Sequence, residues 1–182
     1  MVINVKIVDN DVNNKIHYTQ AIELLNAGEV VAFPTETVYG LGAVATNELA
    51  VAKIFEAKGR PSDNPLIVHV GTIEEIERYV THIPAAAKKC MEVFWPGPLT
   101  LVLEVKPNTL ANNVTAGLST VGIRMPDHPV ALALLQQLGQ PVAAPSANKS
   151  GKPSPTRAEH VADDLEGVIP MVIDGGATGI GL

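Results

Sequence analysis

The sequence predicts an α/β fold with an open, twisted sheet that mixes parallel and antiparallel strands. Runs typical of strands and of helices mostly alternate along the 182 residues, which is the order found in α/β proteins. The alternation breaks at residues 99–124, where two strand-like runs follow each other without a clear helix between them. We therefore expect flanking helices over a sheet in which some neighbouring strands are antiparallel.

The expected strands are short apolar or alternating runs with turn residues at their ends. In chain order they cover residues 3–7, 29–33, 66–70, 99–105, 120–124, 141–144 and 168–173. The stretch 35–42 follows Pro34 and contains two glycines, so we interpret it as a turn.

The expected helices combine apolar residues at helical spacing with residues that favour helix ends. In chain order they cover residues 18–27, 47–59, 72–80, 84–94, 129–138 and 156–165. Asn47 is a favoured N-cap and Gly59 a favoured C-terminal residue. Capping-box spacing, threonine followed three residues later by glutamate, occurs at 72–75 and at 156–159.

Composition limits the class of protein. Hydrophobic residues make up 46% and charged residues 18%, which is ordinary for a globular core, and the length fits one domain, residues 1–182. No apolar run approaches the ~18–20 residues needed to cross a bilayer, and the first residues lack a secretory signal. The single cysteine, Cys90, excludes an internal disulfide and a multi-cysteine zinc site. We expect a cytoplasmic protein without a membrane segment.

The formal net charge of −6 argues against a protein dedicated to nucleic acid, whose domain is usually basic. A local basic cleft stays open as an alternative, because the field at a site depends on nearby charges. Gly151–Lys152 does not belong to a phosphate-binding P-loop, since residue 146 is serine where that loop needs glycine. No serine lies in a nucleophile elbow.

Two cations begin a turn-rich loop. Lys58 and Arg60 follow a predicted helix and precede the turn cluster 61–65, and ligands usually bind at such loops on the rim of a sheet. In an extended segment this spacing puts both side chains on one side, ready to hold adjacent phosphate oxygens. The alternative is a solvated helix end whose cations offset the macrodipole.

A second polar loop, residues 145–156, follows a predicted buried strand late in the chain. It contains Ser146, Asn148, Ser150 and Ser154. Hydroxyls, amides and main-chain N–H groups can cradle phosphate without adding charge, although the same residues are typical of ordinary surface turns. We expect the two loops to converge on one anionic ligand.

Arg124 ends a predicted strand, where its guanidinium could fork onto a ligand carboxylate. The alternative partner is Asp127 or Glu104. His69 lies in an apolar strand, where a lone histidine is more often packed and hydrogen-bonded than catalytic.

Thr35 and Thr37 lie just past a strand end, the side of such a sheet that usually binds ligands. Glu36, between them, could serve a metal or a hydroxyl. Nothing in the spacing singles Glu36 out.

Taken together, five segments resemble one family. They are FPTETVYGLG (33–42), KGRPSDNPLIVH (58–69), WPGPLTLVL (95–103), VGIRMPDHP (121–129) and PSANKSGKPSPT (145–156). In sequence and order they are similar to the threonylcarbamoyl-AMP synthases, the YrdC/TsaC family, and they cover nearly the whole chain. The family pattern Lys-x-Arg followed by Ser-x-Asn falls on Lys58, Arg60, Ser146 and Asn148.

The resemblance implies a nucleotidyltransferase. Such enzymes join L-threonine, bicarbonate and ATP into L-threonylcarbamoyladenylate and release pyrophosphate, the first step of tRNA threonylcarbamoyladenosine modification. Downstream transferase machinery then moves the group to tRNA. The resemblance also implies a large concave cleft, Mg²⁺ held through the phosphates without protein ligands, and an association with double-stranded RNA or tRNA. The alternative is a non-catalytic module that binds double-stranded RNA or a nucleotide.

The resemblance assigns residues to two ligands. For ATP these are Lys58, Arg60, Asn64, Thr120, Ser146, Asn148 and Ser154. For threonine these are Thr35 or Thr37, His69, Arg124 and the main chain at Ala144. Lys58 and Arg60 would act in catalysis by neutralising phosphate charge, and no covalent nucleophile is implied.

The end of the chain departs from the family pattern. A glycine-rich segment like 174–181 is followed in the family by Glu-Ser-Thr, whereas this chain ends at Leu182. We expect a catalytic domain cut at its C-terminus, without the second domain of longer members. Because the segment after Asp174 has four glycines and no apolar periodicity, we expect it to be unanchored and mobile.

Overall fold

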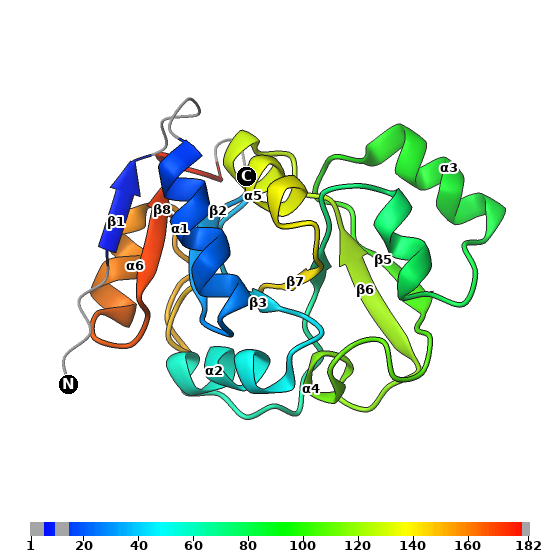
Figure 1. Ribbon diagram of the computed structural model, residues 1–182, viewed down its shortest axis with the longest axis horizontal. Helices are drawn as coiled ribbons and strands as arrows, with labels where there is room; N and C mark the ends of the chain where they lie inside the picture. Colours follow the sequence, from blue (N-terminus) through cyan, green and yellow to red (C-terminus); the bar gives the residue numbers. More distant parts are fainter. Residues whose placement is uncertain (1–5, 10–14, 180–182) are drawn as a thin grey trace.

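The computed structural model describes residues 6–9 and 15–179, and these residues form a sheet of eight strands with helices on both faces (Figure 1). In order across the sheet the strands are β1 (Lys6–Asp9), β8 (Met171–Asp174), β2 (Val31–Pro34), β3 (Tyr39–Val44), β7 (Val142–Ala143), β4 (Val68–His69), β6 (Thr120–Arg124) and β5 (Leu101–Glu104). None of the described helices is long and apolar enough to cross a membrane.

Strand direction changes several times across the sheet. β1, β8 and β2 are parallel, as are β4 and β6. The pairs β2–β3, β3–β7, β7–β4 and β6–β5 are antiparallel. The predicted open sheet with mixed pairing is therefore confirmed.

The helices form two layers. They are α1 (Lys15–Asn26), α2 (Glu48–Lys58), the 3₁₀ helix η1 (Glu74–Arg78), α3 (Ala85–Phe94), α4 (Asn112–Thr115), α5 (Pro129–Leu138) and α6 (Ala158–Leu165). One core cluster joins α1 and α5 to β2, β3, β7 and β8. A second core cluster joins α2 and α6 to the opposite face, and it extends to η1 and α3.

Helix α2 has the ends that the sequence predicts. The Asn47 side chain accepts a hydrogen bond from the Ala50 N–H at 3.1 Å. At the other end, Gly59 is left-handed (φ 65°) and its N–H bonds to Glu56, while the next N–H, of Arg60, bonds to Phe55. This C-terminal motif fixes where the chain leaves the helix.

Three local predictions are wrong or incomplete. The turn predicted at 35–42 is limited to 35–38, because residues 39–44 form strand β3, whose first four residues pair with β2. Gly42 serves packing, since a Cβ there would lie 2.7 Å from both Phe33 and Val142 side-chain atoms. Helix α4 was not predicted, and the residues just before η1 and α6 make no side-chain cap, although Thr72 donates to the Glu75 carboxylate at 3.2 Å. Residues 3–5 of the first predicted strand lie outside the described residues.

One part of the sheet remains open. On β6, Thr120, Gly122 and Arg124 are partly exposed while the two residues between them are buried. Across from Gly122, Val102 on β5 is 67% exposed, and Ile67, beside β4, is 39% exposed. We call these five residues the open strip.

The open strip lies on the same face as α1 and α5. His69 is paired with both Arg124 and Val142, and directly paired residues in neighbouring strands point to the same face. Val142 is in the core beneath α1 and α5. The two helices therefore cover β2, β3 and β7, and the same face stays accessible over β6, β5 and Ile67.

Candidate functional site

Lys58, at the end of α2, is held by the polar loop that follows β7. Its Nζ donates to the carbonyl oxygens of Ser146 at 2.5 Å and Asn148 at 2.8 Å, and lies 3.4 Å from Asn148 Oδ1. The Ser150 N–H donates to the Lys58 carbonyl at 2.8 Å. The two loops therefore meet, as predicted, and the Lys58 ammonium has three oxygen partners on the loop.

The surroundings of Lys58 make its proton easier to lose. The pKa of Lys58 is lowered to about 8, mainly because burial disfavours the charged form. Repulsion by Arg60 lowers the pKa further, while Asp164 acts in the opposite direction. The ammonium charge of Lys58 is thus present at neutral pH and lost in mildly alkaline solution.

Asn148 gives this loop its shape. Its Nδ2 donates to the carbonyl oxygens of Lys149 at 2.8 Å and Lys152 at 2.7 Å, and the residue is 6% exposed. The Nδ2 group of Asn148 therefore holds the loop closed. The carbonyl oxygen and Oδ1 of the same residue face Lys58. Both hydrogen bonds of Asn148 Nδ2 are made within the loop.

Arg60 differs from the sequence-based expectation. The segment after Lys58 is not extended, because Gly59 turns it through a left-handed conformation. The Arg60 guanidinium lies over the Phe55 ring, with 5.5 Å between its carbon and the ring centroid. It lines a hollow of about 340 Å³ beside α2. The prediction that both cations project from one side of an extended strand is wrong.

The other residues assigned to ATP are spread around this region. Asn64 is exposed in the turn that follows Arg60. Ser154 is exposed and lines a hollow of about 280 Å³ with residues of α6. Thr120 begins β6 and is paired with Glu104 on β5. These three residues have no described contact with Lys58, so their roles stay predictions.

The turn between β2 and β3 is built around one hydroxyl. Thr35 Oγ1 donates to the Val38 carbonyl at 2.7 Å and accepts from the main-chain N–H groups of Thr37 and Val38 at 3.2 Å. Thr35 Oγ1 and Thr37 Oγ1 are 3.1 Å apart. Because the single Thr35 proton goes to Val38, the Thr37 hydroxyl is the donor of that pair.

Arg124, at the end of β6, reaches this turn. Its Nη2 forms an ion pair with Glu36 Oε1 and lies 3.4 Å from Thr37 Oγ1. Its Nε donates to the Gly97 carbonyl at 3.3 Å. Burial lowers the pKa of Arg124, but a guanidinium stays charged at neutral pH. Asp127 is one of the two carboxylates expected as partners of Arg124. It takes part only through its main-chain N–H, which donates to Glu36 Oε2.

His69 lies beside Arg124 and is 3% exposed. Burial lowers the pKa of His69 to about 4, so the imidazole is neutral at pH 7. Its ring meets Phe33 edge-on at 6.4 Å, and its Nδ1 has no hydrogen-bond partner among the described residues. Ala144, the last residue assigned to threonine, uses its main-chain N–H on the Ile67 carbonyl at 3.1 Å.

The segment after β8 is anchored on the 35–38 turn, contrary to the sequence-based expectation. Tyr39 Oη donates to the Gly176 carbonyl at 2.8 Å. Thr178 is buried and its hydroxyl donates to the Thr37 carbonyl at 3.1 Å. The Gly179 N–H donates to the Glu36 carbonyl at 3.2 Å. Hydrogen bonds therefore anchor residues 175–179, although the sequence of this segment has no apolar periodicity.

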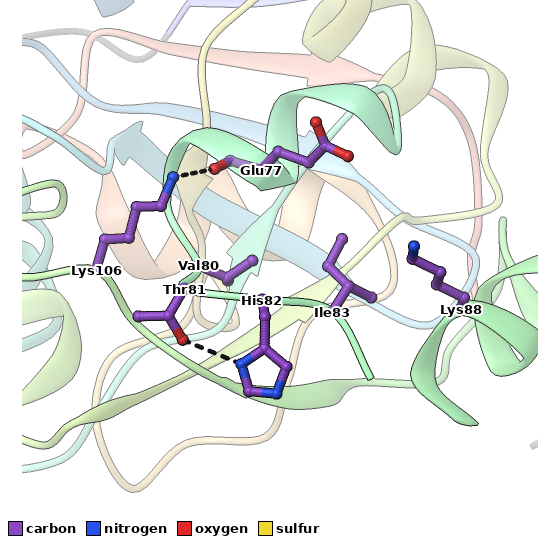
Figure 2. A pocket seen from close by; sticks show the side chains of 7 residues that line it. All are labelled: Glu77, Val80, Thr81, His82, Ile83, Lys88 and Lys106. Carbon is purple, nitrogen blue, oxygen red and sulfur yellow. Dashed lines mark hydrogen bonds between the residues drawn. The ribbon is translucent and has the colours of Figure 1, made fainter. Parts of the chain in front are cut away.

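A separate hollow of about 230 Å³ lies between η1, α3 and the segment that follows β5 (Figure 2). Lys88, Lys106 and His82 contribute to its lining. Figure 2 shows Lys106 directed to the Glu77 carbonyl, which it reaches at 2.7 Å. None of the residues assigned from sequence lines this hollow.

Comparison with known proteins decides the family. A family model named for Sua5, YciO and YrdC, with the description "Telomere recombination", matches residues 23–182. The chain belongs to this family. The predicted resemblance is therefore confirmed, and it covers the Lys58 loop, Arg124 and the polar loop at 145–156 alike.

Two curated relatives are more than half identical to this chain in sequence. A Bacillus subtilis (strain 168) protein named threonylcarbamoyl-AMP synthase is 61% identical over 178 residues, covering 98% of this chain and 51% of that protein. A Pyrococcus abyssi protein of the same name is 55% identical over 162 residues, covering 89% and 47%. The chain spans about half the length of these relatives.

A solved structure supports the fold. Pyrococcus abyssi Sua5 complexed with L-threonine superposes with a TM-score of 0.91 at 50% identity, covering 97% of this chain and 52% of that one. The arrangement of strands and helices described above is thus the Sua5 arrangement over nearly the whole chain.

Sequence reasoning missed one member of the site. Glu36 was not singled out, yet it binds the guanidinium assigned to threonine. Its position between two candidate threonines was the available signal. Its partner lies 88 residues away in the chain, so local spacing could not identify the pair.

Proposed function

We propose that this chain synthesises L-threonylcarbamoyladenylate from L-threonine, bicarbonate and ATP, with release of pyrophosphate. The observation that carries the proposal is a pair of polar centres built by loops of the same sheet: Arg124 on the 35–38 turn and Lys58 on the Ser146 loop. Arg124 supplies a guanidinium at one end of the open strip, and the Ser146 loop, which binds Lys58, follows β7, two strands away from β6. The first suits a carboxylate and the second a polyphosphate.

The dimensions fit two joined ligands. Thr120 and Arg124 are four residues apart on one strand, so their Cα atoms are separated by roughly 13 Å at about 3.3 Å per residue. Gly122 lies between them and adds no side chain to the floor of the strip. An amino acid at the Arg124 end and a nucleotide at the other would meet near Gly122, next to the side chains of Thr100 and Ile67, which lie 3.1 Å and 3.8 Å from where a Cβ of Gly122 would be.

The chemistry requires position and charge neutralisation. The neutral amine of threonine bonds to the carbon of CO₂ from bicarbonate and gives a carbamate, and the proton lost from the nitrogen forms water with the hydroxide that bicarbonate releases. A carbamate oxygen then bonds to the α-phosphorus of ATP, and the bond from that phosphorus to pyrophosphate breaks. Lys58 and Arg60 would offset phosphate charge, and Arg124 would hold the carboxylate, so that the reacting atoms are aligned.

Mg²⁺ fits this site as an ion carried by the nucleotide. The described residues hold no group of three His, Cys, Asp or Glu side chains that could bind a metal. When bound, Mg²⁺ would neutralise charge on the phosphates, as it does in phosphoryl transfer generally. Lys58 and the Ser146 loop would be the protein groups nearest those phosphates.

The proposal extends to the product's use. A carbamoyl-adenylate is an activated acyl donor, so a downstream transferase must consume it, and tRNA adenosine is the acceptor that we propose. We also propose a cytoplasmic location, where ATP and tRNA are found. Direct binding of double-stranded RNA is not needed for this chemistry.

The test is product analysis with threonine, labelled bicarbonate and ATP. We expect label in an adenylate that forms only when all three substrates are present. ATP binding without this product would instead favour the nucleotide-binding module.

A further inference from the structure

Glu36 and Arg124 fix each other inside the site proposed for threonine. Arg124 Nη2 is paired with Glu36 Oε1, and the other carboxylate oxygen accepts the Asp127 N–H at 2.7 Å. The Glu36 and Arg124 side chains are 22% and 11% exposed. Both are therefore held at two points and both keep an edge accessible.

The guanidinium of Arg124 can serve two carboxylates at once. It has five N–H donors. Its described bonds use Nε, on Gly97, and Nη2, on Glu36 and Thr37. None of these bonds to described residues uses Nη1, whose two donors suit a second carboxylate.

The charge at this end of the strip is balanced. A lone cation in a half-buried site attracts any anion, and the proposed reaction brings two anionic substrates, bicarbonate and ATP, close to Arg124. The Glu36 carboxylate cancels that attraction. A zwitterion suits the resulting pair better than an anion, because its ammonium meets a carboxylate and its carboxylate meets a guanidinium.

We propose that Glu36 is a specificity-determining residue that, together with Arg124, makes the site a receptor for a zwitterionic α-amino acid. Arg124 binds the carboxylate and Glu36 faces the ammonium, which is the form that binds and which loses a proton before its nitrogen reacts with CO₂. This inference rests on the proposed function and names the ionic form of the amino acid that the site accepts.

The test compares three ligands that differ in charge at pH 6.5, where an α-amino group is protonated. They are L-threonine, which is a zwitterion, 2,3-dihydroxybutyrate, which is an anion, and L-threoninamide, which is a cation. Binding to the full chain is measured by calorimetry for the unaltered protein and for Glu36→Gln. Glu29→Gln is the matched control, because it breaks a different ion pair, with Lys53.

The expected changes have opposite signs. Glu36→Gln should weaken L-threoninamide at least tenfold, weaken L-threonine less, and strengthen 2,3-dihydroxybutyrate. Glu36→Asp, which keeps the charge, should preserve the ligand order of the unaltered protein even if all affinities fall. Glu29→Gln should change none of the three.

Two results overturn the idea in different ways. Equal weakening of all three ligands by Glu36→Gln, or tighter binding of L-threonine, would reject the role of Glu36 while leaving the proposed function intact. Failure of the unaltered chain to bind L-threonine would reject the proposed function and the inference together.

Discussion

His69 and Arg124 lie directly across from each other in the parallel pairing of β4 and β6. The guanidinium keeps an accessible edge, whereas the imidazole is buried and has a pKa of about 4. A neutral imidazole can lie beside a cation without repulsion. The pair therefore combines one permanent charge with one uncharged, buried ring.

The first prediction concerns acid stability. The pKa of His69 is near 4 in the folded state and about 6.5 when the chain is unfolded, so between these values the unfolded state binds more protons. The free energy of unfolding should fall as the pH drops from about 6.5 to 4, by an amount on the order of 3 kcal/mol. His69→Phe should flatten this decline in urea unfolding measured across that range, and His82→Gln, an exposed histidine, should not. An unchanged decline in His69→Phe would contradict the assignment.

The second prediction concerns the charge of Lys58. Since its pKa is lowered to about 8, ATP affinity should fall as the pH rises through about 8, by roughly tenfold, because the positive charge behind the proposed phosphate site is lost. Lys58→Arg should keep its charge and show no such fall, whatever its absolute affinity. Calorimetric titration from pH 7 to 9.5 measures this, with Lys53→Met on the same helix as control. A flat profile in the unaltered chain would remove Lys58 from the phosphate site.

The third prediction concerns the loop that Asn148 closes. Asn148→Ala removes the side-chain bonds to the Lys149 and Lys152 carbonyls, and it should lower the free energy of unfolding by about 2 kcal/mol. Asn64→Ala, at an exposed turn, should change it by less than about 0.5 kcal/mol. Equal stability of both variants in urea unfolding would mean that the loop holds its shape without the amide.

The fourth prediction concerns the anchored segment 175–179. The Thr178 and Gly179 amides should exchange slowly with solvent deuterium, because both are hydrogen-bonded and Thr178 is buried. Thr178→Val keeps the side-chain shape but loses the bond to Thr37, so exchange at Gly179 should accelerate. Thr46→Val, at an exposed position, is the control. Fast exchange at both amides in the unaltered chain would restore the expectation of a mobile tail.

Local signals predicted most of the regular structure. Asn47 and Gly59 delimited α2 because caps act within one turn of the helix, and Pro129 with Gly139 delimited α5 for the same reason. The hairpin strand at 39–44 was missed because its glycines suggested a turn. The actual reason for Gly42 is close contact with residues from other strands, which local reasoning does not include.

The candidate site was predictable in its residue types and less so in its geometry. The meeting of the Lys58 and Ser146 loops followed from their matching chemistry. The positions of Arg60 and Glu36 did not, because one depends on a left-handed glycine and the other on a contact between distant segments. The anchoring of residues 175–179 was missed because it rests on scattered hydrogen bonds rather than on an apolar pattern.

The central claim is that threonine and ATP bind along one face of the sheet, at the two ends of the open strip. A crystal structure of the chain with L-threonine and a non-hydrolysable ATP analogue tests this most directly. We predict the threonine carboxylate on Arg124, the phosphates against Lys58 and the Ser146 loop, and the amine and α-phosphorus facing each other above Gly122. An analogue bound instead in the hollow of Lys88 and Lys106, or a threonine carboxylate away from Arg124, would contradict the account.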